Sequence, residues 1–158
     1  MPDGQSSVMA HTLEAGILAG REWHPSPFRN KLVAKVTGPV LARVNGSPID
    51  IGVELRDGDI IPFPFPVHVV HLPGHTAGSI ALFLPDQKLV IIGDALQHKL
   101  GRELSPPASN VTDNLEQAVD SLHKLLDLNF DAICFSHFPP MRSRASEALR
   151  KMLRQQAT

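Results

Sequence analysis

Apolar residues recur in short blocks along the second half of the chain, and their lengths predict strands. Three blocks rich in aliphatic and β-branched residues predict strands at 67–72, 80–84 and 88–92. A turn at 85–87 joins the last two. A fourth block predicts a buried strand at 132–136. We expect these strands to build the sheet of the domain.

Two other segments of this half have helical spacing. The first runs from about Asp113 to Leu128, and the second from Ser143 to Arg154. The inward positions predicted for them are Leu115, Ala118, Val119, Leu122, Leu125 and Leu126, then Ala145, Leu149, Met152 and Leu153. Strands and helices in this order place helices against a sheet, which predicts an α/β or α+β sandwich.

The first half gives a weaker pattern. A short helix is predicted over 12–19, capped by Thr12 and stopped by Gly20. The apolar face of this helix would be Leu13, Ile17 and Leu18. Segments 32–36 and 40–44 predict two strands or a hairpin. Turns are predicted at Asn45-Gly46 and Asp57-Gly58.

Length and composition favour one ordinary globular domain over residues 1–158. The chain is 42% hydrophobic and 20% charged, and 15 basic residues against 16 acidic ones leave a net charge of −1. That balance gives no reason to expect nucleic acid or a membrane surface as a partner. One cysteine, Cys134, excludes an internal disulfide, and residues 1–7 are too polar for a signal peptide. We therefore expect a cytoplasmic protein.

Three residues with metal-ligand chemistry follow predicted strands closely: His75, Asp94 and His137. Strand ends fix a side chain's position while loops leave it accessible, so functional groups gather there. Gly74 and Gly93 precede two of them and are expected to relieve Cβ crowding. Two imidazoles and a carboxylate suit zinc, and also manganese or iron. Spacing alone leaves a second interpretation open, in which each histidine is an ordinary hydrogen-bonded residue and Asp94 belongs to a turn or cap.

The motifs around these residues resemble a known family. The segment His71-Leu72-Pro73-Gly74-His75-Thr76-Ala77-Gly78-Ser79 is similar to the PGHTxGS motif of the metallo-β-lactamase superfamily. Residues 91–96 (IIGDAL) resemble its GD motif, and residues 135–140 (FSHFPP) resemble its GHGPP motif. Residues 8–18 (VMAHTLEAGIL) resemble the strand and helix after the family's first metal motif. The resemblance implies an αββα sandwich.

The resemblance also implies a ligand set. His75 would be the third histidine of a first metal site, Asp94 would bridge two ions, and His137 would bind the second. One or two zinc ions would then activate a water molecule for hydrolysis. The implied substrate is a small-molecule ester, thioester, lactone, amide or phosphodiester. No further catalytic or cofactor-binding residue is assigned.

Two departures from the family pattern weaken the expected activity. The HxHxDH motif is absent from the sequence, which leaves each metal with two protein ligands where catalytic zinc needs three. Phe138 stands where the family usually has glycine, so it would narrow the mouth of the site or indicate a relaxed one. We expect an N-terminally truncated domain whose sandwich has an incomplete first half.

Three hypotheses follow. The chain is a truncated zinc hydrolase with impaired or no activity. Alternatively, it is a non-catalytic binding or assembly module that forms a homo-oligomer through an open sheet face. In a third arrangement His75, Asp94 and His137 close around one ion. We rank the third lowest, because the family geometry spreads these ligands over two ions.

The remaining histidines and the cysteine have ordinary explanations. His68 and His71 are predicted on opposite faces of one strand, and His11 near the start of the first helix. Cys134 is predicted to be a small buried hydrophobe. Surface or loop positions are predicted for His24, His98 and His123.

Overall fold

The computed structural model describes residues 7–22, 47–99 and 103–156. The chain divides into two compact units, Met1–Leu55 and Arg56–Thr158. The prediction of a single domain over residues 1–158 stays a prediction, because compact units can still fold together. His75, Asp94 and His137 all belong to the second unit.

In the first unit, a strand leads directly into a helix. Strand β1 (Met9–His11) is followed by α1 (Thr12–Leu18), and β1 pairs in parallel with β2 (Val53–Leu55). The predicted cap was wrong by one residue, because His11 caps the helix and its Nδ1 accepts a hydrogen bond from the Leu13 N–H at 3.3 Å. An imidazole nitrogen thus replaces the expected hydroxyl.

The end of α1 follows the prediction, but its apolar face does not. Gly20 adopts a φ of +67°, which glycine tolerates best, and its N–H bonds to the Ile17 carbonyl. Leu13 and Leu18 are exposed, and Ala15 is the buried residue of the helix. The predicted strands at 32–36 and 40–44, His24 and the Asn45-Gly46 turn lie outside the described residues.

The second unit contains a five-stranded sheet in the order β3-β4-β5-β6-β9. Its strands are β3 (Ile60–Pro62), β4 (Pro66–His71), β5 (Ile80–Leu84), β6 (Leu89–Ile92) and β9 (Ala132–Phe135). Neighbours are antiparallel except β6 and β9, which are parallel. Four of these strands match the predicted blocks. Strand β3 was not predicted; it follows the predicted Asp57-Gly58 turn, in which Gly58 has a φ of +84°.

Two short strands and two helical regions complete this unit. Strands β7 (Gln97–His98) and β8 (Leu104–Ser105) pair with each other. The first predicted helix is α3 (Leu115–Ser121) continued by the 3-10 helix η2 (Leu122–Asp127), preceded by a 3-10 turn η1 (Ser109–Val111). The last helix is α4 (Ala145–Gln156). Asn114 caps α3, because its side chain accepts a hydrogen bond from the Gln117 N–H.

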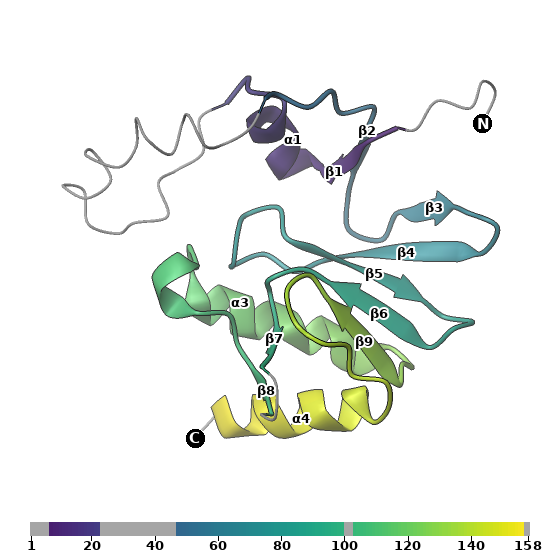
Figure 1. Cartoon of the computed structure of the whole chain (residues 1–158), viewed down its shortest axis with the longest axis vertical. Helices are drawn as coiled ribbons and strands as arrows, with labels where there is room; N and C mark the ends of the chain where they lie inside the picture. Colours follow the sequence, from purple (N-terminus) through teal and green to yellow (C-terminus); the bar gives the residue numbers. More distant parts are fainter. Residues whose placement is uncertain (1–6, 23–46, 100–102, 157–158) are drawn as a thin grey trace. The chain divides into compact units, whose positions relative to one another are not determined.

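The core lies between one face of the sheet and the helices, which cover the same side of it (Figure 1). Alternating strand residues point into this core, and the inward positions of α4 are those predicted. The core includes Ala81, Phe83, Val90, Ile92 and Ile133 from the sheet, and Leu122, Leu125, Leu149, Met152 and Leu153 from the helices. This arrangement confirms the predicted mixed α+β class.

The opposite face of the sheet is also apolar. Register places Val69, Leu82, Ile91 and Cys134 in one row across β4, β5, β6 and β9. Val69 is 1% exposed whereas Ile91 is 42% exposed, so the face is covered at one end of the row and open further along. Cys134 is partly buried within this row, in keeping with a small hydrophobe.

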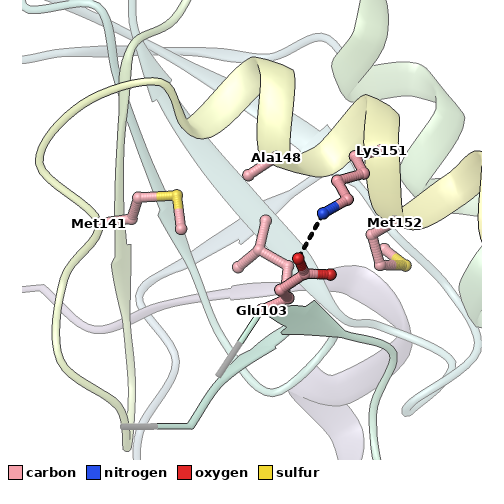
Figure 2. A pocket seen from close by; sticks show the side chains of 6 residues that line it. Glu103, Met141, Ala148, Lys151 and Met152 are labelled. Carbon is pink, nitrogen blue, oxygen red and sulfur yellow. Dashed lines mark hydrogen bonds and ion pairs between the residues drawn. The ribbon is translucent and has the colours of Figure 1, made fainter. Parts of the chain in front are cut away.

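A hollow of about 210 Å³ lies beside α4, between this helix and β8. Figure 2 shows Met141, Ala148 and Met152 around it, with an ion pair between Lys151 and Glu103 at its edge. None of the three candidate metal ligands lines it. Within the part of the chain that the structure describes, no helix is long and apolar enough to cross a membrane.

Candidate functional site

Sheet register brings the three candidate ligands to one edge. Strands β6 and β9 run in parallel with Ile92 opposite Phe135, and Asp94 and His137 each follow two residues later. Strand β5 starts at the same edge, because it is antiparallel to β6. The loop 72–79, which joins β4 to β5 and contains His75, therefore opens there too.

Asp94 lies between the two histidines. Its Oδ2 atom is 3.4 Å from Nε2 of His137 and 4.0 Å from Nε2 of His75. The three side chains differ in exposure: 17% of the His75 side chain is exposed, 36% of Asp94 and 71% of His137. The structure thus brings together all three residues predicted from the sequence, with one end of the row sheltered and the other open to solvent.

The His75 loop is held by hydrogen bonds within itself and to the strand before it. The Leu72 N–H donates to the Ser79 carbonyl at 2.8 Å, which closes the loop at its base. The Ser79 hydroxyl oxygen accepts from the Thr76 N–H at 3.0 Å and lies 3.0 Å from the Thr76 hydroxyl. Nε2 of His71 contacts the Ala77 carbonyl at 2.8 Å. These bonds explain why a loop without regular structure keeps a defined shape.

The same loop also bonds to the residues just before α3. The Asn114 N–H donates to the Gly74 carbonyl at 2.9 Å, and the Asp113 N–H donates to the His75 carbonyl at 3.1 Å. At Gly74 the φ is +131°, and an added Cβ would lie 2.1 Å from the backbone nitrogen of Ala118. Glycine is required at this position, because both its backbone conformation and its contact with α3 exclude a side chain.

The expectation for Gly93 was wrong. An added Cβ there would meet its nearest neighbour, the Ser136 hydroxyl oxygen, at 3.8 Å, which is an ordinary van der Waals distance. Gly93 therefore relieves no crowding beside Asp94, and its φ lies outside the range that favours glycine. The structure gives no steric reason for a glycine here.

Thr112 contacts the ring of His75, a contact that was not predicted from the sequence. Nδ1 of His75 lies 3.2 Å from the Thr112 hydroxyl oxygen, and the hydroxyl donates to the Ala108 carbonyl at 2.8 Å. Thr112 is buried, with 7% of its surface exposed. It stands 37 residues from His75, shortly before Asn114, the cap of α3, and nothing in the sequence indicates this contact.

An ion pair supports the strand end that leads into the His75 loop. Asp57 accepts hydrogen bonds from the His71 N–H at 2.8 Å and from Nζ of Lys124 at 2.7 Å, and Nζ also donates to the His71 carbonyl. Partial burial by itself raises the pKa of Asp57. The bond from the His71 N–H and then the Lys124 ammonium outweigh that effect, so the pKa of Asp57 falls below its ordinary value of 3.8.

The His137 loop is held at its far side. The Ile133 and Met141 backbones exchange two hydrogen bonds of 2.9 Å, which close the segment between them. Nδ1 of His98 contacts the Pro139 carbonyl at 2.9 Å, and its ring lies 5.6 Å from that of Phe135. Phe138, the residue expected to narrow the site, is half-buried.

The donor set suits a metal ion in chemistry, but the number of donors is small. Two donors on one tetrahedral zinc ion lie about 3.4 Å apart, which matches the separation of Asp94 and His137. The 4.0 Å to His75 approaches the limit of roughly 4.2 Å for two donors on opposite sides of one ion. Both separations are compatible with donors that bind a common ion. Residues 7–22, 47–99 and 103–156 contain no group of three or more His, Cys, Asp or Glu residues that could hold a metal.

The other described histidines have partners outside this site. The ring of His68 packs 6.1 Å from that of Phe83, on the helix-covered face of the sheet. His123 is exposed and contacts the carbonyl of Asp120, within its own helical turn. His11 caps α1. These contacts agree with the ordinary explanations given to these residues from the sequence.

Comparison with known proteins identifies the family. The model of the metallo-β-lactamase superfamily matches residues 7–137, which is most of the chain and includes all three candidate ligands. The chain belongs to the metallo-β-lactamase superfamily. The resemblance to this family and the metallo-β-lactamase-like mixed fold class are thereby confirmed.

Similar proteins extend this result. A probable metallo-hydrolase, YflN of Bacillus subtilis (strain 168), is 30% identical over 154 residues, which cover 87% of this chain and 56% of that protein. A hydroxyacylglutathione hydrolase of Brucella ovis is 39% identical over 71 residues, covering 44% of this chain and 27% of the enzyme. The crystal structure of the metallo-β-lactamase family protein TTHA1429 from Thermus thermophilus matches with a TM-score of 0.65 at 20% identity, over 96% of this chain and 53% of that one. The chain thus spans about half the length, or less, of these relatives.

Proposed function

We propose that this chain provides part of the active site of a metal-dependent hydrolase, with His75, Asp94 and His137 as metal ligands. The observation that supports this most directly is the position of Asp94 Oδ2 between Nε2 of His75 and Nε2 of His137. In the proposed site this carboxylate would be the ligand shared by the two ions that the family motifs imply. Zinc is the preferred metal, and manganese and iron also suit the donors.

Each residue has its own part in the proposed site. His75 would be the rigid ligand, because its loop is hydrogen-bonded to the strand before it and to the segment before α3. Asp94 would supply one oxygen to each ion. His137, with 71% of its side chain exposed, would be the ligand most accessible to a substrate. When bound, the metal would lower the pKa of a water molecule and polarise the scissile carbonyl group.

The proposed substrate is a small-molecule ester, thioester or lactone. The similarity to a hydroxyacylglutathione hydrolase supports the thioester in particular, because the matched 71 residues form nearly half of this chain. Loops around the site set substrate choice in folds that host many reactions. Phe138, half-buried and next to His137 in sequence, is the residue that we propose limits the size of the acyl group.

We further propose that the chain alone has impaired or no activity. Two protein ligands per ion fall short of the three that a catalytic zinc ion normally has. The HxHxDH motif, which would supply the rest, does not occur in these 158 residues. Full activity would require those ligands from additional sequence.

Metal binding tests the site itself. The purified chain would be dialysed to remove metal, titrated with zinc, manganese(II) or iron(II), and analysed for bound metal. We expect zinc to bind. Asp94→Asn should weaken the affinity for zinc at least about tenfold, because each ion would lose one of its two protein ligands. Asp86→Asn, in an exposed turn, is the matched control and should leave affinity unchanged. No stoichiometric zinc, or equal binding by Asp94→Asn, would contradict the site.

Hydrolysis and assembly measurements test the function. The zinc-loaded chain would be assayed on an aryl ester, an acyl thioester and a lactone, before and after upstream coding sequence with an HxHxDH motif is joined to it. Turnover only in the joined protein would support the proposal. Joined protein that binds zinc but hydrolyses none of the three would contradict it. If light scattering of that inactive protein shows a stable dimer, the partly open apolar face around Ile91 would favour the assembly module.

A further inference from the structure

Thr112 is one of the few buried polar residues in the part of the chain that the structure describes. It is 7% exposed, and its hydroxyl oxygen lies between the Ala108 carbonyl, at 2.8 Å, and Nδ1 of His75, at 3.2 Å. A buried hydroxyl needs partners, and here both are within hydrogen-bond distance. One of the two partners is a candidate metal ligand.

The direction of these two bonds follows from the single proton of the hydroxyl. A carbonyl oxygen has no hydrogen, so Thr112 must donate its proton to Ala108. Toward His75 the hydroxyl oxygen can then only accept. Nδ1 of His75 must therefore be protonated in this contact, and in a neutral imidazole Nε2 is left with its lone pair.

Asp94 favours the other tautomer, in which Nε2 of His75 carries the proton. Its carboxylate would attract a proton on Nε2 of His75, since an N–H is a better neighbour for a carboxylate than a lone pair is. The distances decide between the two acceptors. The 3.2 Å to Thr112 is within hydrogen-bond range, whereas the 4.0 Å to Asp94 is not.

We propose that Thr112 is a positioning residue that holds His75 in its Nδ1–H tautomer, so that the Nε2 lone pair faces Asp94 in the metal-free protein. A metal ion needs that lone pair, and hydrogen bonds to the other ring nitrogen are the usual means of fixing it. The importance of this tautomer for hydrolysis rests on the proposed function. The tautomer itself does not.

The tautomer is measured directly by nitrogen NMR. Long-range proton–nitrogen spectra of the metal-free protein at pH 8 distinguish protonated from unprotonated ring nitrogens, and His75→Gln identifies the His75 signals. We expect Nδ1 to carry the proton in the wild type and in Thr112→Ser, which keeps the hydroxyl. Thr112→Val has the same shape without the hydroxyl, and we expect its proton to move to Nε2, toward Asp94. Ser121→Ala also removes a buried hydroxyl, one that donates to the Ala118 carbonyl in its own helix, and should leave the tautomer unchanged.

Zinc affinity gives the second measurement. Thr112→Val should bind zinc 10–100-fold more weakly, and Thr112→Ser should stay within about threefold of the wild type. A wild-type His75 protonated at Nε2 overturns the proposal, and so does a Thr112→Val protein with unchanged tautomer and affinity. If Thr112→Val does not fold, the wild type and Thr112→Ser still decide, because both must show the Nδ1–H form. Tautomer control without any hydrolysis by the protein joined to an HxHxDH-containing segment would contradict only the proposed function.

Discussion

His75 and His137 lie on either side of Asp94, yet their surroundings differ sharply. The side chain of His75 is 17% exposed, its ring contacts Thr112, and its carbonyl accepts a hydrogen bond from the Asp113 N–H. The side chain of His137 is 71% exposed, and the bonds that hold its loop are made by neighbouring residues such as Pro139 and Met141. One histidine is positioned by the protein around it, and the other mainly by the strand before it.

This difference indicates how such a site divides its tasks. A side chain with fixed surroundings loses little conformational freedom when it binds a ligand, so the entropic cost has already been met during folding. An exposed side chain loses more on binding, but it leaves space for a substrate. We infer that substitutions on the His75 side of the site destabilise the fold, whereas substitutions on the His137 side have little effect on it.

The largest expected effect comes from Gly74, beneath the His75 loop. Gly74→Ala would place a Cβ 2.1 Å from the Ala118 nitrogen at a φ of +131°. Steric overlap and an unfavourable backbone conformation together should cost at least about 3 kcal/mol of unfolding free energy, or prevent folding. Urea denaturation measures this.

Two other glycines separate the causes of that loss. Gly58→Ala has a similar positive φ, +84°, but no atom within 4 Å of the added Cβ, so it should cost only about 1–2 kcal/mol. Gly93→Ala, on the Asp94 side, lacks both a clash and a positive φ, so it should stabilise the fold by at most about 1 kcal/mol. Equal losses for Gly74→Ala and Gly93→Ala would mean that the two sides of the site do not differ as described.

A moderate effect is expected from Ser79. Ser79→Ala removes the hydroxyl that accepts from the Thr76 N–H and contacts the Thr76 hydroxyl, both at 3.0 Å. The loss should be about 1 kcal/mol of unfolding free energy, the usual net contribution of a partly buried hydrogen bond. Hydrogen exchange would locate the change, because the Thr76 amide should exchange faster while the Ile133 and Met141 amides, near His137, keep their wild-type rates.

The sequence predicts the edge of the sheet better than it predicts the side chains around it. Apolar blocks gave β4, β5, β6 and β9, and three residues just beyond strands or in their loops proved to lie together. That success has a simple cause, since parallel pairing of β6 with β9 carries residues at equal distances past each strand to the same place. Local hydrophobic period is sufficient to detect such strands.

Contacts between distant segments were not predictable in this way. Thr112 and His75 are 37 residues apart, and Lys124 and Asp57 are 67 residues apart. No local pattern encodes either pair, because each depends on where α3 and η2 pack against the sheet. The cap of α1 failed for another reason: histidine is an uncommon cap, so propensity favoured the neighbouring Thr12.

The smallest expected effect concerns Asp57, and it depends on pH. Asp57 has a pKa below 3.8 in the folded protein, so its charged form stabilises the fold fully above that value, and the contribution disappears as the pH falls through the folded pKa. The side chain is 50% exposed, so solvent screening should keep the effect below about 1 kcal/mol. Asp57→Asn should therefore be slightly less stable than the wild type at pH 6, and the gap should close as the pH falls below 3.8.

Repeating the Asp57→Asn comparison in a protein that also carries Lys124→Gln identifies the source of this stability difference. Without the ammonium group, the stability difference caused by Asp57→Asn should shrink at pH 6 but persist in part, because the His71 N–H still donates to the side chain at position 57. A gap that stays the same size would exclude Lys124 as a cause of the lowered pKa. Because Lys124 also bonds the His71 carbonyl, at the start of the His75 loop, the same substitution should speed exchange at the Leu72 amide and leave the His137 loop unchanged.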